Sequence, residues 1–95
     1  MAGWDARFRY VNVTLSPASV AANTSAEEIF AVPGVRVDDM VLSVNKPTAQ
    51  AGLGIVGYRV SSEGNVGVTF QNSTAVAIVP TASQSYSVAL MTKQP

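Results

Sequence analysis

The chain has 95 residues, which is enough for one domain with a thin hydrophobic core. Six basic and six acidic residues give a net charge of zero, which argues against a positive surface for nucleic acid. The absence of cysteine and histidine excludes disulfides, thiolate chemistry and imidazole chemistry, and no apolar run is long enough to span a membrane.

Residues 1–10 do not fit the alternating pattern that follows them. They combine aromatic side chains with cations: Trp4, Arg7, Phe8, Arg9 and Tyr10. Extending the parity of 11–15 backwards places both arginines on the inward face and Phe8 and Tyr10 on the outward face. Either a β-bulge reverses the register, or 1–10 lie on a neighbouring subunit, where Trp, Tyr and Arg are favoured anchors. We therefore predict an N-terminal arm or edge strand over 1–10 and treat its aromatic and arginine residues as interface candidates.

From residue 11 onwards, apolar and polar residues alternate with the two-residue period of a β-strand. Strands are predicted over 11–15, 18–22, 29–32, 40–44, 56–60, 66–70, 75–79 and 85–90. Ser25 and Glu28 have the spacing of a helix capping box. Too few residues separate them from Pro33 for a helix, however, and Phe30 and Val32 alternate, so we predict a strand there.

The expected inward faces follow from the same alternation. They are Met40, Leu42 and Val44; Val56, Tyr58 and Val60; Val66, Val68 and Phe70; and Tyr86, Val88 and Leu90. Glu63-Gly64-Asn65 suits a tight hairpin. Many short strands with turn signals between them predict an all-β fold: a single antiparallel β-sandwich over 11–95, either jelly-roll or immunoglobulin-like.

No motif in the chain indicates catalysis, a metal site or a cofactor. The glycines of 52–57 match the dinucleotide-binding fingerprint by letter, but β-patterned residues follow them where that mechanism needs a helix. The adjacent acids at 27–28 and 38–39 face opposite sides of a strand, so neither pair forms one carboxylate site. No serine has a histidine or a plausible lysine base nearby in the sequence, since Lys46 precedes a proline and Lys93 lies near the end of the sequence. We predict no catalytic residue, metal ligand or cofactor.

Arg59 is an isolated cation in the middle of the domain. It is either simply solvated or paired with a carboxylate across a subunit contact, and it joins the interface candidates on the second interpretation. Charged residues make up only 13% of the chain, against 47% apolar residues. With so little charge to keep copies apart, we expect part of the surface to be covered by other subunits. The alternative is a fully exposed surface that is hydrated through its Ser, Thr and Asn side chains.

Several segments together resemble a known family. They are the turns and strand cores of 32–41, 46–47, 52–60, 68–75 and 86–91. This pattern resembles small virion structural proteins of tailed bacteriophages. The resemblance implies a β-sandwich that decorates the head as a cement protein or forms part of the tail, without enzyme activity. Residues 4–10 lie outside it.

We therefore expect a virion structural protein, made in the host cytoplasm, that binds the major capsid protein or other virion proteins. A homo-oligomer, dimer or trimer, is expected because closed symmetry suits repeated lattice sites. Neither nucleic acid nor a membrane is an expected partner. The alternative is a tail or fibre component, or a sandwich that binds carbohydrate or another surface ligand. The inward parity of Tyr58 and Tyr86 argues against a sugar-binding groove.

Overall fold

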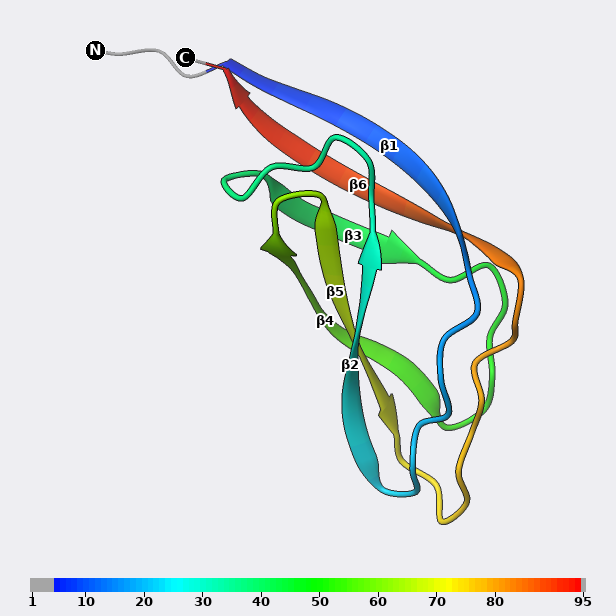
Figure 1. The fold of residues 1–95 in the computed structure, drawn as a ribbon. Coiled ribbons are helices and arrows are strands. Elements are labelled where there is room, and N and C mark those ends of the chain that lie inside the picture. The colour runs from blue at the N-terminus through cyan, green and yellow to red at the C-terminus, as the bar shows by residue number, and fades with distance from the viewer. Residues whose placement is uncertain (1–4, 95) are drawn as a thin grey trace.

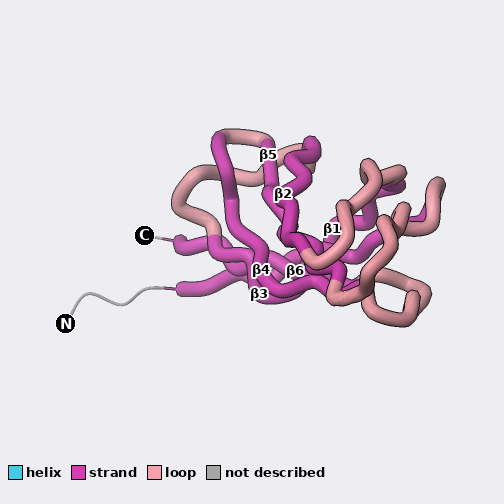
Figure 2. The backbone as a smooth tube through the Cα atoms, turned by 90° about the horizontal axis from the view of Figure 1, so that it is seen from below, coloured by secondary structure: helices cyan, strands magenta, loops and turns pink. Residues whose placement is uncertain are grey.

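The computed structural model describes residues 5–94, and within this range the chain forms β-strands and no helix (Figure 1 and Figure 2). The strands are β1 (Asp5–Leu15), β2 (Thr24–Ala31), β3 (Met40–Asn45), β4 (Leu53–Ser62), β5 (Asn65–Asn72) and β6 (Gln84–Gln94). They form two three-stranded antiparallel sheets, with orders β1-β6-β3 and β2-β5-β4. We call these the β6 sheet and the β5 sheet after their central strands. The all-β prediction is confirmed, and no helix in the described range could cross a membrane.

The first half of the chain pairs with the second half in reverse order. Strand β1 pairs with β6, so that Asp5 lies opposite Gln94 and Leu15 opposite Gln84. Strand β2 pairs with β5 in the other sheet. The two ends of the described chain therefore meet at one tip of a molecule that measures 52 × 24 × 20 Å (Figure 1).

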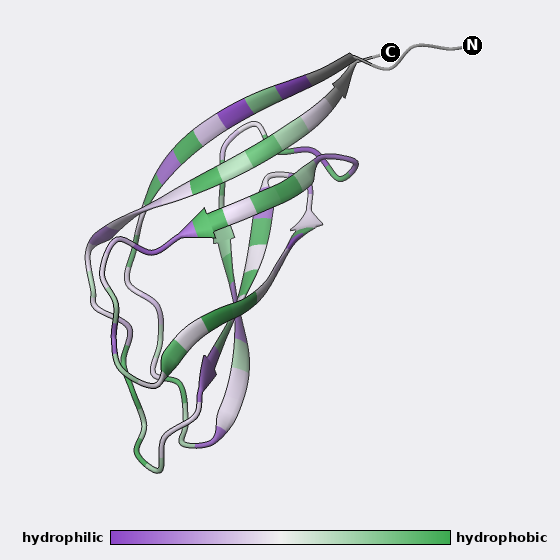
Figure 3. Ribbon diagram, turned by 180° about the vertical axis from the view of Figure 1, so that it is seen from behind, coloured by the Kyte–Doolittle hydropathy of each residue, from purple (hydrophilic) through white to green (hydrophobic). Residues whose placement is uncertain are grey.

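The core lies between the two sheets. It is built from inward residues of both sheets and of the connecting segments: Tyr86, Val88, Leu90, Val41, Val66, Val68, Phe70, Val20, Val32 and Val35. The rings of Phe70 and Tyr86 meet edge-on, with centroids 6.4 Å apart. Such a contact adds about 0.5–1.5 kcal/mol to the burial of the rings. Hydrophobic and hydrophilic residues alternate along the strands in Figure 3, and the predicted inward faces over 66–70 and 86–90 are confirmed.

Two β-bulges make the predicted inward faces of β3 and β4 partly wrong. The register of β3 against β6 shifts between Val41 and Ser43, so Leu42 is an extra residue. Val41 is therefore buried, whereas Met40 and Leu42 are 54% and 38% exposed. A similar shift in β4 leaves Val56 outside the core. Because alternate residues of a strand point to opposite faces, one inserted residue changes which residues on one side of it point inward.

The two short strands predicted at 18–22 and 75–79 are also wrong. These segments share only one isolated bridge, in which Val20 and Ile78 exchange N–H···O bonds of 2.8 and 3.0 Å. The buried amide of Asn72 donates to the carbonyls of Val20 and Val76 instead. The Asn72 side chain thus satisfies backbone carbonyls that a neighbouring strand would otherwise satisfy, so these segments can remain loops.

Other local predictions are confirmed. Residues 24–31 form strand β2 rather than a helix. Strands β4 and β5 are joined by the predicted hairpin, in which Gly64 has φ +78°. A side chain would be strained there, so glycine permits the tight reversal.

Candidate interaction surface

Strand β1 carries the exposed aromatic side chains of the N-terminal segment. Its register against β6 is unbroken from Asp5 to Leu15, so the β-bulge considered from the sequence is wrong. The parity is as the alternation predicts: Val11 packs against the core, while Phe8 and Tyr10 point outward and are 69% and 79% exposed. Trp4, another interface candidate, lies outside the described residues.

Pairing across the β6 sheet places more apolar side chains beside these two aromatics. Phe8 lies opposite Met91, which lies opposite Met40 on β3. In the next row, Tyr10 lies opposite Ala89. We call this group the aromatic patch: Phe8, Tyr10, Met40, Ala89 and Met91. Large apolar groups gathered on one exposed face mark a protein-binding site more often than single exposed residues do.

The aromatic patch ends where the rows of the same face become polar. Asn12 lies opposite Ser87, and Ser87 lies opposite Asn45 on β3. The Ser87 hydroxyl donates to Asn12 Oδ1 over 2.9 Å. The apolar part of this outer face therefore spans the two rows of the aromatic patch, in which Ser43, opposite Ala89, is the polar member, and the face is polar in the row of Asn12.

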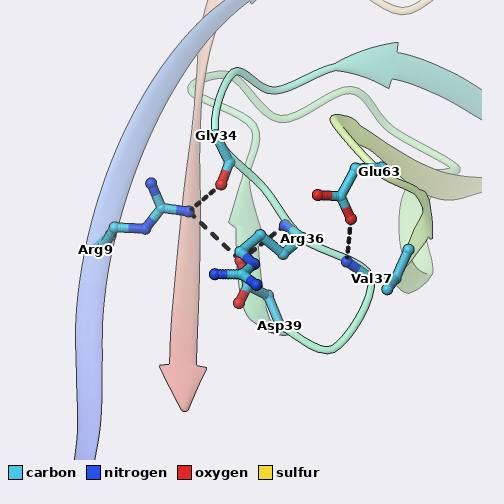
Figure 4. Close-up of polar contacts among 6 residues, drawn as sticks. All are labelled: Arg9, Gly34, Arg36, Val37, Asp39 and Glu63. Atoms are coloured by element: carbon cyan, nitrogen blue, oxygen red, sulfur yellow. Dashed lines mark hydrogen bonds and ion pairs between the residues drawn. The ribbon is translucent and has the colours of Figure 1, made fainter. Parts of the chain in front are cut away.

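Arg9 occupies an inward position of β1, and its charge is satisfied within the chain. Its guanidinium donates to the carbonyl of Gly34 over 3.2 Å and lies 3.5 Å from Asp39 Oδ2 (Figure 4). The Asp39 side chain is only 1% exposed, and the Arg9 side chain is 31% exposed. A cation on a core-facing position is tolerated because a buried carboxylate and a carbonyl meet it there. Arg7, two residues earlier, is exposed.

Two hydrogen bonds to carboxylates hold the segment between β2 and β3, residues 32–39, in place. On one side, Asp39 Oδ2 also accepts the Arg36 N–H over 3.0 Å. On the other side, Glu63 of the β4–β5 hairpin accepts the Val37 N–H over 3.1 Å (Figure 4). Two side chains from other parts of the chain, Arg9 of β1 and Glu63 of the hairpin, and the segment's own Asp39 therefore fix its position.

Arg59 makes its ion pair inside the chain, on the outer face of the β5 sheet. Its guanidinium donates to both carboxylate oxygens of Glu27, over 2.8 and 2.9 Å. The two residues come from the edge strands β4 and β2, and they meet over Gly67 of β5, which has no side chain to separate them. This hydrogen bond lowers the pKa of Glu27 and raises that of Arg59. Arg59 is thus neither simply solvated nor dependent on a second subunit for a carboxylate.

A groove of about 360 Å³ adjoins the aromatic patch. It lies between the start of β3 and the second half of β4, and it shares Met40 and Met91 with the patch. Tyr58 lines it, is 41% exposed, and donates its hydroxyl to the Leu42 carbonyl over 3.0 Å. The sequence did not reveal Met40 and Met91 as part of this surface, because Met91 meets Phe8 only through the pairing of β1 with β6, and Met40 joins them only through the pairing of β3 with β6.

The remaining chemical motifs do not form a site among the described residues. Gly52 has φ +80° in a turn, and a Cβ there would collide with the Thr74 methyl group; strand β4, not a helix, follows it. Within 5–94, no three acidic residues gather at metal-binding distance. A second cavity, of about 170 Å³, lies between β1 and β2. Its carboxylate, Glu28, accepts the Ala18 N–H over 2.9 Å.

Comparison with known proteins adds no relative: no family model matches the chain, and neither the curated proteins nor the solved structures give a significant match. The outer face of the β6 sheet is therefore the feature on which a functional proposal can be based.

Proposed function

We propose that the protein is a non-enzymatic virion structural protein that decorates an assembled phage head and stabilises it. Its partner is the major capsid protein or another virion protein. The observation that carries this proposal is the exposure of Phe8 and Tyr10, 69% and 79%, on a regular strand beside Met40 and Met91. Aromatic side chains contribute much of the energy of protein interfaces, and a strand holds them in a fixed position.

The strand order supports a jelly-roll type of sandwich. Pairing of β1 with β6 and of β2 with β5 is what a long rolled hairpin gives, although β4 departs from that pattern by pairing with β5 in the sheet opposite β3. In an immunoglobulin-like sandwich the first two strands share one sheet, whereas here they lie in different sheets. Jelly-roll sandwiches are common in viral capsid proteins and in lectins.

A decoration protein acts by mass action. A domain that binds only the assembled shell stabilises that shell by its free energy of binding. Many identical copies on one particle give a large total effect from modest individual contacts. A patch of a few aromatic and methionine side chains is sufficient for such a contact, provided that many copies bind at once.

The second candidate is a tail or fibre component or a carbohydrate-binding sandwich. One observation favours it: Tyr58 is 41% exposed and lines the groove beside the aromatic patch. Tyr86 does not contribute, because it is fully buried in the core. Glycan-array binding that is lost in Tyr58→Ala would favour this candidate over head decoration.

The test is stoichiometric binding to shells assembled from the major capsid protein of the same virus. The double variant Phe8→Ser/Tyr10→Ser should keep its cooperative thermal transition and lose at least about tenfold in affinity in co-sedimentation. The control is Ile29→Ser, which removes a 49% exposed apolar residue from β2 of the other sheet. Unchanged binding by the double variant would overturn the role of the aromatic patch.

A further inference from the structure

The two sheets have four edge strands, and three of them are interrupted or charged. Strand β3 is six residues long and contains the bulge at Leu42. Strand β4 has two register shifts. Strand β2 carries Glu28 near its centre; among the described residues no cation forms an ion pair with it, so a second copy paired there would bring like charges together. Short length, bulges and charges are the usual devices that prevent pairing at an edge.

Strand β1 lacks these devices along its outer edge. It is eleven residues long, contains no proline, and keeps an unbroken register against β6. No other strand of the described chain pairs with its second edge. Of its two inward-parity cations, Arg9 is paired with Asp39, and Arg7 is exposed and would lie opposite Val13 of a second copy if all eleven residues paired. Strand β1 therefore presents a long row of free N–H and C=O groups.

The sequence of β1 favours one register for pairing with a second copy. Tyr10 is the middle residue of the strand, so an antiparallel pair centred on it matches all eleven residues, with Asp5 opposite Leu15. In this register Arg9 faces the partner's Val11. A shift of two residues toward the N-terminus would place Arg9 opposite the partner's Arg9, and like charges opposite each other are destabilising. Length and charge thus select the same register.

We propose that two copies of the chain form a two-fold dimer by pairing β1 with β1 along its whole length. The two β6 sheets then become one six-stranded sheet with the order β3-β6-β1-β1-β6-β3. The new pair supplies about ten backbone hydrogen bonds. Because Tyr10 pairs with the partner's Tyr10, the two aromatic patches join on the same face. The dimer forms in solution without a shell, so it stands apart from the proposed decoration function.

Charge substitution at the two-fold axis tests the interface. The wild-type chain should sediment with twice the mass of its 9.9 kDa chain. Tyr10→Lys and Tyr10→Glu should each weaken association at least about tenfold and sediment as monomers, because each places like charges opposite each other. An equimolar mixture of the two variants should regain the dimer mass. Tyr10 is 79% exposed, so both variants should still unfold in one cooperative transition, at a Tm below that of the wild-type dimer because they lose the stabilisation that association contributes.

The control for this experiment is Asn45→Lys, which adds the same charge to β3 on the same face and should remain dimeric. A monomeric wild-type chain at high micromolar concentration, or a Tyr10→Lys variant that remains dimeric, would overturn the proposal.

Cysteine cross-linking tests the register, and the chain has no cysteine of its own to interfere. Tyr10→Cys should form a disulfide dimer with itself, because directly opposed strand residues lie within disulfide range. Asn12→Cys should not cross-link with itself but should cross-link with Phe8→Cys, since residues 8 and 12 are opposite in this register. Failure of Tyr10→Cys to cross-link, or efficient self-linking of Asn12→Cys, would contradict it.

Discussion

The outer faces of the two sheets differ in how their side chains are satisfied. On the β5 sheet, Glu27 and Arg59 meet over Gly67 and complete each other within the chain. On the β6 sheet, Phe8 and Tyr10 extend into solvent beside methionines. The charges of the first face are paired with each other. Covering the second face with another surface would be favourable, because each large aromatic side chain can bury about 150–250 Å².

This difference also separates the edges of the two sheets. Strand β2, at the edge of the β5 sheet, carries Glu28, which has no ion pair among the described residues and would repel the same residue of a second copy. Strand β1, at the edge of the β6 sheet, has Arg9, one of its two inward-parity arginines, paired with Asp39, and its outward positions are filled by aromatic and uncharged residues. One half of the molecule is therefore protected against association, and the other half is suited to it.

The largest expected effect on stability comes from a substitution in the core, which lies between the two sheets. Phe70→Ala removes a buried ring that packs against Tyr86 between the sheets. We expect a loss of about 3–5 kcal/mol in the free energy of unfolding, measured by urea titration. Circular dichroism and tyrosine fluorescence should report the same midpoint. Separate midpoints would show that the two faces belong to independent folding units.

The matched control for Phe70→Ala is Tyr86→Phe, in the same ring pair. The Tyr86 hydroxyl is buried and has no hydrogen-bond partner among the residues that the structure describes. Burial also raises the pKa of this phenol. Removing an unpaired buried hydroxyl should leave stability unchanged or raise it by about 1 kcal/mol. A large loss instead would mean that the hydroxyl has a partner.

An intermediate effect is expected on the β1 side of the comparison. Asp39→Asn removes the carboxylate charge that faces Arg9 and should cost about 1–2 kcal/mol, because the Arg9 side chain is partly reached by water. Thermal unfolding at neutral pH measures the loss. Arg7→Gln, at an exposed position of the same strand, should change stability by less than about 0.5 kcal/mol. Equal effects of the two substitutions would contradict the role of the Arg9–Asp39 pair.

The smallest effect is expected on the outer face of the β5 sheet. Arg59 lowers the pKa of Glu27 in the folded protein below its usual 4.5. The pair's contribution to stability is therefore complete above the unfolded-state pKa and is lost as the pH falls through the lower folded-state pKa. Glu27→Gln should remove this part of the acid dependence of Tm, by a small amount because the pair is exposed. Arg59→Gln should do the same, and an unchanged pH profile in both variants would contradict the assignment.

Strand identity and core faces were predictable where alternation is regular. Residues 66–70 and 86–90 lie in central strands, and each alternate residue is buried as the pattern indicates. The same rule failed at Leu42 and Val56, because a bulge is set by how two strands fit together and leaves no mark on the alternation of one strand. Residues 18–22 and 75–79 have strand-like composition, but the Asn72 side chain takes over their hydrogen bonding.

The candidate interaction surface was predictable only where it depends on the sequence of a single strand. The parity of β1 gave the outward facing of Phe8 and Tyr10. The partners of Arg9 and Arg59 were not predictable, because Asp39 and Glu27 are about thirty residues away in the sequence and meet these arginines only through the sheet order. The same holds for Met40 and Met91, which reach Phe8 from two other strands.

The position of β6 has a consequence for how the molecule assembles during synthesis. Of the six described strands, β6 is synthesised after the other five and is the central strand of its sheet, so β1 and β3 have no common partner until residues 84–94 appear. The β5 sheet, by contrast, can close once residue 72 is available. Strand β1 and its aromatic side chains therefore have no native strand partner until residues 84–94 have been synthesised. The pairing itself is then slow, because the two strands are far apart in the sequence.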